Sequence, residues 1–336
     1  MRKKDPRHIV SWITPFFSLK KLIRTGDQKF VFPFYHAVSN NPGPHLKHLY
    51  PIKTVEDFIN DLEILLKYFS PISPPELFNF EKHPPKPAFL ISFDDGLREV
   101  YNNIAPILKE KGIPAIFFLN NNFIDNRDLF YRYKVSLLID KIESDELKNE
   151  VVQLINKKVK SRINVKYHLK HFFLELQYHE KGMIDDFCEM LEVDVENFLN
   201  REKPYMSETQ IMDLKKDGFY IGAHSFNHPE FHHIDPKNQK KEVMKSTEDI
   251  RKRFDLDYSL FSFPFSDYGV SPEVLRSIHS DPAFKPGATF GTGGMKKFSD
   301  FAHFQRLSME KYRGNSEKIL TTEYVYFKLK KLLGKH

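Results

Sequence analysis

Two adjacent aspartates, Asp94 and Asp95, follow a short apolar run in the segment FLISFDDG, which spans residues 89–96. Carboxylates at the end of a buried strand are costly unless they are paired, so the chain must supply partners for them. Neighbouring residues of an extended strand point in opposite directions, but both can face one site where the chain turns. One aspartate can then bind a metal while the other accepts a proton. Alternatively, the pair caps the helix that follows.

Two histidines four residues apart, His224 and His228, end another strand-like segment in the sequence FYIGAHSFNH. Such a pair can direct two imidazoles at one metal ion if the segment turns helically, and a carboxylate from elsewhere completes the set. In a chain with 15 histidines, one pair of this spacing is weak evidence by itself. Its occurrence together with the two aspartates, again at a strand end, favours a shared metal site.

The elements that must position these residues alternate between strands and helices. Within residues 88–119, AFLISF, REVYNNIAPILKEKG and IPAIFFL predict a βαβ unit with parallel strands and a right-handed crossover. The alternation resumes near residue 207, with strands predicted at FYIGA, LFSFPFS, ATFGTGG and FQRLSME. Repeated βα units over this length predict an α/β fold resembling a barrel, with its site at the C-terminal ends of the strands.

Three regions are expected along the chain. Residues 29–336 form the main domain, and a helically periodic stretch poor in Gly and Pro, at about 125–203, is predicted to be a helical insertion in it. Residues 1–28 form an N-terminal basic segment that is a poor signal peptide, and its apolar stretch, residues 9–19, is too short to span a bilayer. This segment either packs on the domain as a first helix or lies on an anionic membrane surface. We therefore expect a cytoplasmic protein, or one that is peripheral at the inner face of the membrane.

Composition argues against several classes of protein. The net charge is +6, but the lysines are scattered through mixed-charge segments rather than grouped as a basic arm, which disfavours nucleic acid as a partner. Cys188 is the single cysteine, so neither an intramolecular disulfide nor a cysteine-rich zinc site can form.

Four segments in order, SFDDG, APILKEKGIPAIFFL, GAHSFNHPEF and FSFPFSDYG, resemble the polysaccharide deacetylases, which are carbohydrate esterase family 4 with its NodB-homology domain. The resemblance covers roughly Lys29 to Glu310 apart from the insertion. It implies a distorted (β/α) barrel of the NodB-homology type with a helical insertion. It also implies metal-dependent removal of an N- or O-acetyl group from a sugar.

The resemblance also implies roles for individual residues. Asp94 matches the catalytic base of the family, and Asp95, His224 and His228 match its metal ligands. The metal is usually zinc, so the expected cofactor is a divalent ion, with Zn²⁺ as the leading candidate. In the family, a backbone N–H in the third motif stabilises the oxyanion, and this maps here to the neighbourhood of Pro264 and Phe265.

The sequence departs from the family pattern at two places. The third motif in many members begins with an arginine that orients the catalytic base, whereas Ser262 stands there. The late histidine that serves as general acid is also missing, because FQRLSME offers Arg306 and Glu310 but no histidine at that place. His303 lies several residues too early.

A different histidine is predicted to act as the general acid. A subgroup similar to the biofilm-polysaccharide deacetylases takes its acid from an early strand, and FYHAV provides His36 there. Histidine suits the role because its pKa lies near the working pH. The alternative is a strand-end histidine bonded to backbone. The remaining histidines near the motifs are interpreted as surface or loop residues: His45, His48, His232 and His233.

The sequence therefore predicts a metal-dependent deacetylase that acts on an N-acetylated sugar of a bacterial surface glycan or its precursor. The expected partners are an acetylated carbohydrate or a lipid- or nucleotide-linked sugar, with membrane contact through residues 1–28 as an option. Two alternatives remain: a degenerate carbohydrate-binding or scaffold protein of the same fold, and a hydrolase of another non-peptide C–N bond.

Overall fold

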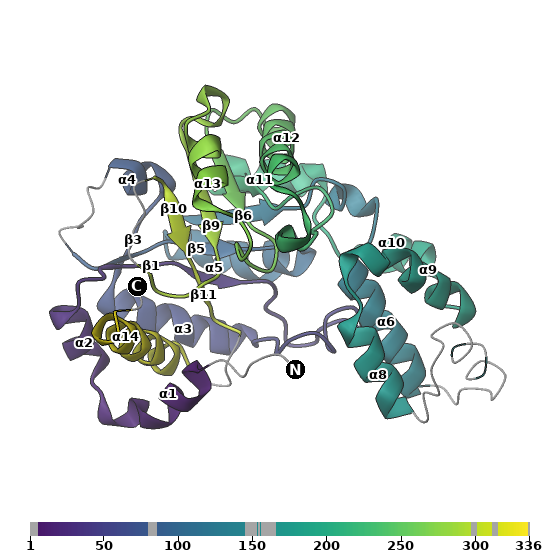
Figure 1. Ribbon diagram of the computed structural model, residues 1–336, viewed down its shortest axis with the longest axis horizontal. Helices are drawn as coiled ribbons and strands as arrows, with labels where there is room; N and C mark the ends of the chain where they lie inside the picture. The colour runs from purple at the N-terminus through teal and green to yellow at the C-terminus, as the bar shows by residue number, and fades with distance from the viewer. Residues whose placement is uncertain are drawn as a thin grey trace.

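The computed structural model describes residues 6–79, 86–144, 153, 155, 166–296, 301–310 and 315–334 (Figure 1). The strands are β1 (Phe30–Val31), β2 (Pro33–Tyr35), β3 (Ser70–Pro71), β4 (Ala88–Phe89), β5 (Ile91–Phe93), β6 (Ala115–Leu119), β7 (Tyr220–Ala223), β8 (Ser259–Ser262), β9 (Gly287–Gly291), β10 (His303–Gln305) and β11 (Leu307–Ser308). The α-helices are α1 (Arg7–Ile13), α2 (Leu19–Thr25), α3 (Val55–Tyr68), α4 (Pro74–Asn79), α5 (Ala105–Glu110), α6 (Tyr131–Ser144), α8 (Lys166–Glu175), α9 (Lys181–Met190), α10 (Val195–Glu202), α11 (Glu208–Lys216), α12 (Pro236–Phe254), α13 (Pro272–His279) and α14 (Ser316–Leu332).

Eight strands form one parallel sheet in the order β10-β9-β8-β7-β6-β5-β2-β11. Its two outer strands, β10 and β11, are separated only by Arg306. The Arg306 amide donates to the Gly291 carbonyl at 3.0 Å on one side, and the Leu307 amide donates to the Phe32 carbonyl at 2.8 Å on the other. One segment thus pairs with both ends of the sheet and nearly closes it into the predicted (β/α) barrel. The predicted βαβ unit around β5 and β6 is confirmed, with these strands parallel.

A second, smaller parallel sheet has the order β1-β4-β3. Two of its strands continue into strands of the barrel. Only Phe32 separates β1 from β2, and only Leu90 separates β4 from β5. The chain that leads to Asp94 therefore pairs first in the small sheet, at β4, and then in the barrel, at β5.

Side chains of β6 show how the barrel is packed. Ile116 and Phe118 belong to the cluster inside the barrel, together with Leu260 and Phe290. Their neighbour Phe117 faces outward into the larger cluster between strands and helices. A strand buried on both faces reads as an unbroken apolar run, which is why AIFFL shows no alternation in the sequence.

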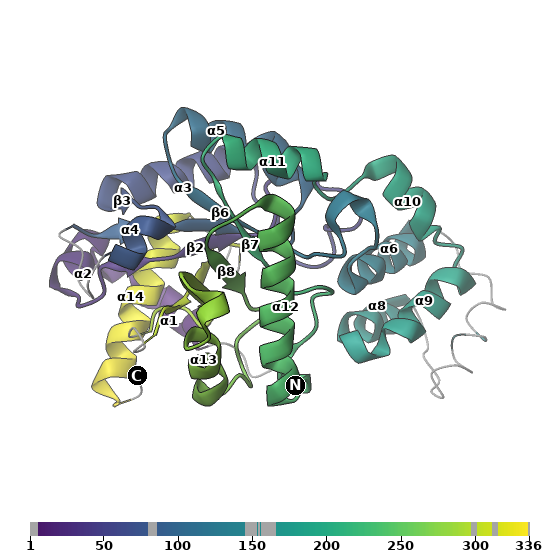
Figure 2. The ribbon, with the colours of Figure 1, turned by 90° about the horizontal axis from the view of Figure 1, so that it is seen from above.

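Two groups of helices lie at opposite ends of the molecule in both ribbon views (Figures 1 and 2). The helices α1, α2 and α14 gather at one end. At the other end lie α6, α8, α9 and α10, which are the described elements between residues 131 and 202. The helical nature predicted for this stretch is therefore seen over its described residues, whereas the part of the prediction that covers 145–152, 154 and 156–165 lies outside them. The domain boundary at residue 29 stays a prediction.

The loop after β2 packs against the insertion through His45, which was expected to be a surface or loop residue. His45 is 3% exposed, and its ring lies 5.4 Å from those of Tyr133 and Phe198. Burial lowers the pKa of His45 to about 4, so it is neutral and acts as an aromatic packing group. His48 is also buried, at 7% side-chain exposure between Asp140 and Glu143. Both histidines lie in a loop, which the interpretation as surface or loop residues allowed, but the insertion covers this loop, so His45 is not at the surface.

His232 and His233 are exposed, as expected. Among the described residues, no helix is both long enough and apolar enough to cross a membrane.

Candidate active site

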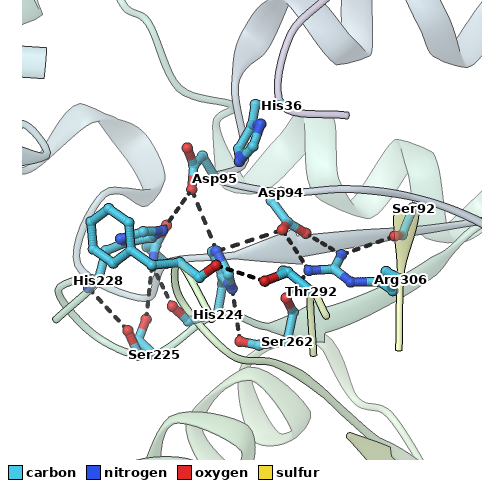
Figure 3. A network of polar contacts seen from close by, with 12 residues as sticks. His36, Ser92, Asp94, Asp95, His224, Ser225, His228, Ser262, Thr292 and Arg306 are labelled. Carbon is cyan, nitrogen blue, oxygen red and sulfur yellow. Dashed lines mark hydrogen bonds and ion pairs between the residues drawn. The ribbon is translucent and has the colours of Figure 1, made fainter. Parts of the chain in front are cut away.

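The two adjacent aspartates lie where β5 ends, and both are buried, at 2% and 3% exposure. Asp94 continues the strand, and its amide donates to the Tyr35 carbonyl of β2 at 2.9 Å. Asp95 has a φ of 71°, which turns the chain sharply at this residue. The turn brings both carboxylates to the same side, instead of opposite sides as in an extended strand (Figure 3).

The two histidines follow β7 on a neighbouring strand of the barrel. The His224 amide donates to the Leu119 carbonyl at 2.7 Å, which extends the pairing of β7 with β6 by one residue. The segment from His224 to His228 is not helical, so the two imidazoles converge by another route than a helical turn. Ser225 and His228 instead have positive φ angles of 66° and 55°, and this irregular turn places both imidazoles beside Asp95 (Figure 3).

Asp95, His224 and His228 present one ligand atom each toward a common point, and these three atoms lie within 4.8 Å of one another. The Oδ1 atom of Asp95 is 3.3 Å from His228 Nε2 and 3.6 Å from His224 Nε2. The Oδ1 atom of Asp95 and the Nε2 atom of His224 are buried without a hydrogen-bond partner among the described residues. Orphaned buried ligand atoms are what a divalent cation would satisfy, so the residues fit a metal.

The state of these groups also suits a metal. The Nδ1–H of His224 donates to the Ser262 carbonyl at 2.8 Å, which leaves the Nε2 lone pair facing Asp95. Burial lowers the pKa of His224 to about 4, so the imidazole is neutral and free to bind. Burial raises the pKa of Asp95, but the adjacent His228 outweighs it and holds that pKa below its usual range.

A tyrosine of the insertion contacts the same carboxylate. The Tyr133 hydroxyl, on α6, donates to Asp95 Oδ2 at 2.7 Å. It lies 3.4 Å from the hydroxyl of Tyr50, whose ring borders the site region. Because Oδ2 is occupied by Tyr133, Oδ1 is the oxygen that remains directed at the histidines. The sequence analysis did not identify Tyr133, since nothing in YRYK distinguishes a tyrosine that reaches a strand end from one that packs on a neighbouring helix.

The guanidinium of Arg306 holds the other aspartate. It donates to both oxygens of Asp94, each at 2.7 Å, as a bidentate pair with no exposed surface on the arginine side chain. It also donates to Ser92 Oγ at 3.0 Å and Ser262 Oγ at 2.5 Å, and it lies 4.4 Å from the centre of the Phe34 ring. Burial raises the pKa of Asp94, yet Arg306 more than offsets this and keeps the carboxylate ionised.

Arg306 resolves the departure at the third motif. The small Ser262 leaves space at the end of β8, and the arginine from the seam between β10 and β11 fills that space and bonds the serine (Figure 3). The group that orients Asp94 is thus supplied by another strand. The sequence offered the residue type in FQRLSME, but only the closure of the barrel directs it inward.

His36 follows β2, and the carboxylate of Glu310 contacts both its imidazole ring and its backbone amide. Its Nδ1 lies 2.6 Å from Glu310 Oε2, and the amides of His36 and Ala37 donate to Oε1 at 2.9 and 3.1 Å. The Tyr50 ring lies 4.8 Å from the imidazole. Burial alone lowers the pKa of His36, but Glu310 reverses this and raises it to about 9. His36 is therefore protonated at neutral pH, and its other nitrogen faces the cleft that the aspartates line.

The third-motif loop reaches the site through Phe265. This residue has a φ of 56°, and its ring lies 4.5 Å from His228. The Thr292 hydroxyl donates to the Phe265 carbonyl at 2.7 Å, which connects this loop to the segment GTGG, residues 291–294, at the end of β9. The Phe265 amide donates to no group among the described residues, whereas Pro264 has no amide hydrogen to offer. Phe265 is thus positioned for the oxyanion role, which stays a prediction.

These groups share one cleft of about 300 Å³, at the lower end of the sizes typical of small-molecule sites. Its lining includes His36, Asp94, Asp95, His228 and Phe265. Arg7 and Glu323 border it on the side of α1 and α14, and Phe130 and Arg132 border it on the side of the insertion. The cleft therefore lies between the two helical groups of Figures 1 and 2.

Comparison with known proteins places this site in a family. The family model described as polysaccharide deacetylase matches residues 81–168 and 178–279, which is more than half of the chain. No curated protein sequence gives a significant match.

Solved structures share the fold. The Streptococcus pyogenes deacetylase PplD, in complex with acetate, has a TM-score of 0.54 at 14% identity, covering 88% of this chain and 97% of that one. IcaB from Ammonifex degensii has a TM-score of 0.53 at 16% identity, covering 89% and 97%. A polysaccharide deacetylase from Bacillus cereus has a TM-score of 0.52 at 12% identity, covering 87% and 68%. At these identities the likeness shows the fold.

Proposed function

Because the chain belongs to the polysaccharide deacetylase family, whose members are hydrolases of non-peptide C–N bonds, we propose a specific reaction for it. It removes the acetyl group from an N-acetylated sugar of a bacterial surface glycan or its precursor. The reaction uses a divalent metal, with Zn²⁺ as the leading candidate, held by Asp95, His224 and His228. One observation carries this proposal: two buried ligand atoms of this cluster lack partners, while Asp94, the next residue, is held apart by Arg306.

When bound, the metal would polarise the acetyl carbonyl and make a water more acidic. Asp94 is ionised by its pairing with Arg306 and can accept the proton of the attacking water as general base. As the tetrahedral intermediate forms, the Phe265 amide can donate to the developing oxyanion. Asp94 and Phe265 both line the cleft, which supports the proposal that one bound acetyl group meets both.

The leaving nitrogen must gain a proton, and His36 is the group proposed to donate it. Glu310 raises the pKa of His36 to about 9, so the imidazolium is present at neutral pH and can transfer its Nε2 proton to the departing amine. The same pair fixes the tautomer, because the carboxylate accepts from Nδ1 and leaves Nε2 to face the cleft.

The proposed partners are an acetylated carbohydrate or a lipid- or nucleotide-linked sugar, and the proposed location is the cytoplasm, with the inner membrane face as an option. Aromatic and polar side chains line the cleft, among them Tyr50, Phe130 and Arg132, and this lining supports a sugar as the substrate. A carbohydrate-binding or scaffold protein would have no use for an ionised base opposite an imidazolium, so the retained pair supports an enzyme.

The test measures acetate release from N-acetylglucosamine oligosaccharides, together with bound metal, for the wild type and for Asp94→Asn. The variant keeps the shape of the side chain, so it should retain the metal while losing about 10³-fold or more in kcat. Asp213→Asn, at an aspartate far from the cleft, is the matched control and should behave as wild type. A wild type that binds no metal, or an Asp94→Asn protein that keeps full activity, would overturn the proposal.

A further inference from the structure

The first helical segment presents its apolar stripe to solvent. Ile9, Trp12, Ile13 and Phe16 recur at helical spacing along α1 and the 3₁₀ turn that follows, and they are 76%, 83%, 42% and 86% exposed. Val10, on the opposite side, is 7% exposed and belongs to the main core. Helices on soluble proteins normally turn such a stripe toward the core, so this arrangement is inverted.

Exposed apolar side chains are concentrated in this part of the molecule. The described residues include eleven large hydrophobic side chains that are exposed, and five of them lie between Ile9 and Phe17. Three more lie at the end of α14: Leu329, Leu332 and Leu333. The two elements adjoin, since α1 packs along α14 and Arg7 bonds Glu323 at 2.8 Å. Eight of the eleven thus come from adjoining terminal elements.

Residues 7–26 and 324–334 carry only basic charges, whereas Glu317 and Glu323 lie earlier on α14 and Asp27 pairs with Lys331. Between Arg7 and Gly26 the sequence contains Lys20, Lys21 and Arg24 and no acidic residue. From Tyr324 to Gly334 it contains three lysines and again no acidic residue. A surface that combines exposed tryptophan and phenylalanine with lysine and arginine has the chemistry of a peripheral contact with anionic lipid. A protein partner of ordinary composition would not require this single sign of charge.

The apolar stripe also adjoins the catalytic cleft. Arg7 is the first residue of α1 and lines the cleft with Glu323, while Trp12 and Phe16 follow one and two turns later. A surface that contacts α1 would therefore lie next to the mouth of the cleft.

We propose that α1, the turn to Phe17 and the end of α14 dock on an anionic lipid surface, with Trp12 and Phe16 entering the headgroup region. This docking surface goes beyond the proposed reaction and does not depend on it. It holds the cleft at the membrane, where a sugar on a lipid carrier could enter it without leaving the bilayer surface.

The chain contains a single tryptophan, Trp12, so tryptophan fluorescence reports on this surface alone. Vesicles of phosphatidylcholine and phosphatidylglycerol in equal parts should shift the Trp12 emission to shorter wavelength and carry the protein upward in a flotation gradient. Vesicles of phosphatidylcholine alone should bind more weakly, and high salt should release the protein from the mixed vesicles.

Variants separate this surface from the rest of the molecule. Ile9→Ser with Phe16→Ser keeps the fluorophore and should weaken partitioning to mixed vesicles by about tenfold or more. Leu66→Ser, at an exposed leucine on α3, is the control and should bind as wild type. Acetate release from a soluble oligosaccharide should be unchanged in all of these proteins, so failure of docking and failure of the proposed reaction can be told apart.

Two results would overturn the docking proposal. One is an unchanged Trp12 emission together with no flotation on mixed vesicles. The other is an emission shift without vesicles that grows with protein concentration and accompanies a dimer in ultracentrifugation, because a second copy of the chain would then cover the stripe.

Discussion

The neighbouring aspartates of the site have different partners, and the difference arises at a single backbone angle. Asp94 keeps the direction of β5 and meets Arg306. Asp95, at a φ of 71°, turns away and meets Tyr133 and the two histidines. A carboxylate that is already bonded twice by an arginine is kept ionised and oriented, whereas one with an unpartnered oxygen is available to a metal. Two adjacent residues can thereby take unlike roles in one small cleft.

Replacing Arg306 should cost both stability and activity. In Arg306→Met, Asp94 would be left as a buried charge without its partner, so the free energy of unfolding should fall by about 3 kcal/mol, measured by urea denaturation. Arg306→Lys keeps the charge but loses the bidentate geometry. Its free energy of unfolding should lie between those of the wild type and Arg306→Met. Arg276→Met removes an exposed arginine paired with Glu273 and should change stability by less than about 1 kcal/mol. An Arg306→Met protein as stable as wild type would show that the pair does not hold the site.

Replacing Glu310 should move the alkaline limb of the pH–rate profile. Glu310 raises the pKa of His36 to about 9, while burial alone lowers it. In Glu310→Gln, burial prevails, so the pKa should fall to about 6.5 or below and the imidazole should lose its proton near neutral pH. Because a general acid must be protonated, the decline of kcat/KM should move from about pH 9 to about pH 6.5 or below. Glu317→Gln, which contacts Tyr68 instead, should leave the profile in place.

The same pair links stability to pH. The folded-state pKa of His36 is raised above its unfolded value, so the pair stabilises the fold fully below pH about 6.5. This contribution is lost as the pH rises through about 9.

An alkaline limb of the pH–rate profile that stays where it is in Glu310→Gln would contradict the assignment of His36 as the acid.

At the scale of elements, the insertion is joined to the catalytic centre. Its first long helix, α6, carries Tyr133 to Asp95, and the residues just before and within it, Phe130 and Arg132, line the cleft. His45 locks the loop after β2 under the same helix by ring contacts with Tyr133 and Phe198. The insertion therefore contributes both to the geometry of a proposed metal ligand and to the wall that a substrate meets.

Removing one hydroxyl from α6 tests this connection. Tyr133→Phe keeps the packing but takes the donor from Asp95 Oδ2, so the dissociation constant for Zn²⁺ should rise about tenfold, measured by competition with a chelator. Tyr101→Phe removes a hydroxyl that bonds Asp213, far from the site, and should leave zinc affinity unchanged. Equal zinc affinity in Tyr133→Phe and wild type would indicate that the hydroxyl has no influence on the metal site.

Most elements could be predicted from local sequence, because apolar runs and helical periodicity depend only on neighbours along the chain. The strands at AFLISF and IPAIFFL and the helices of the insertion follow such patterns. The turn at HSFNH could not be predicted, since the positive φ angles of Ser225 and His228 depend on contacts with other strands. The burial of His45 within its loop was missed for a related reason, because it is produced by a helix about 90 positions later.

At the scale of the whole molecule, closure of the barrel assembles the site. The segment of residues 303–308 pairs with both β9 and β2, and Arg306 lies at the junction with its side chain among the rings of Phe34 and Phe118. Asp94 and Arg306 are 212 positions apart in the sequence, so no local pattern connects them. Order and spacing of motifs singled out Asp94, Asp95, His224 and His228, whose roles as base and metal ligands stay predictions, whereas the residues that orient them required the closed fold.

The central claim is that one divalent ion, held by Asp95, His224 and His228, is required for deacetylation. The most direct measurement titrates chelator-treated protein with Zn²⁺ while following acetate release from an N-acetylglucosamine oligosaccharide. We expect no release at the start, a linear rise to one equivalent of metal and a plateau beyond it, with no rise in His228→Ala. Full activity before metal is added, or an equal rise in His228→Ala, would contradict it.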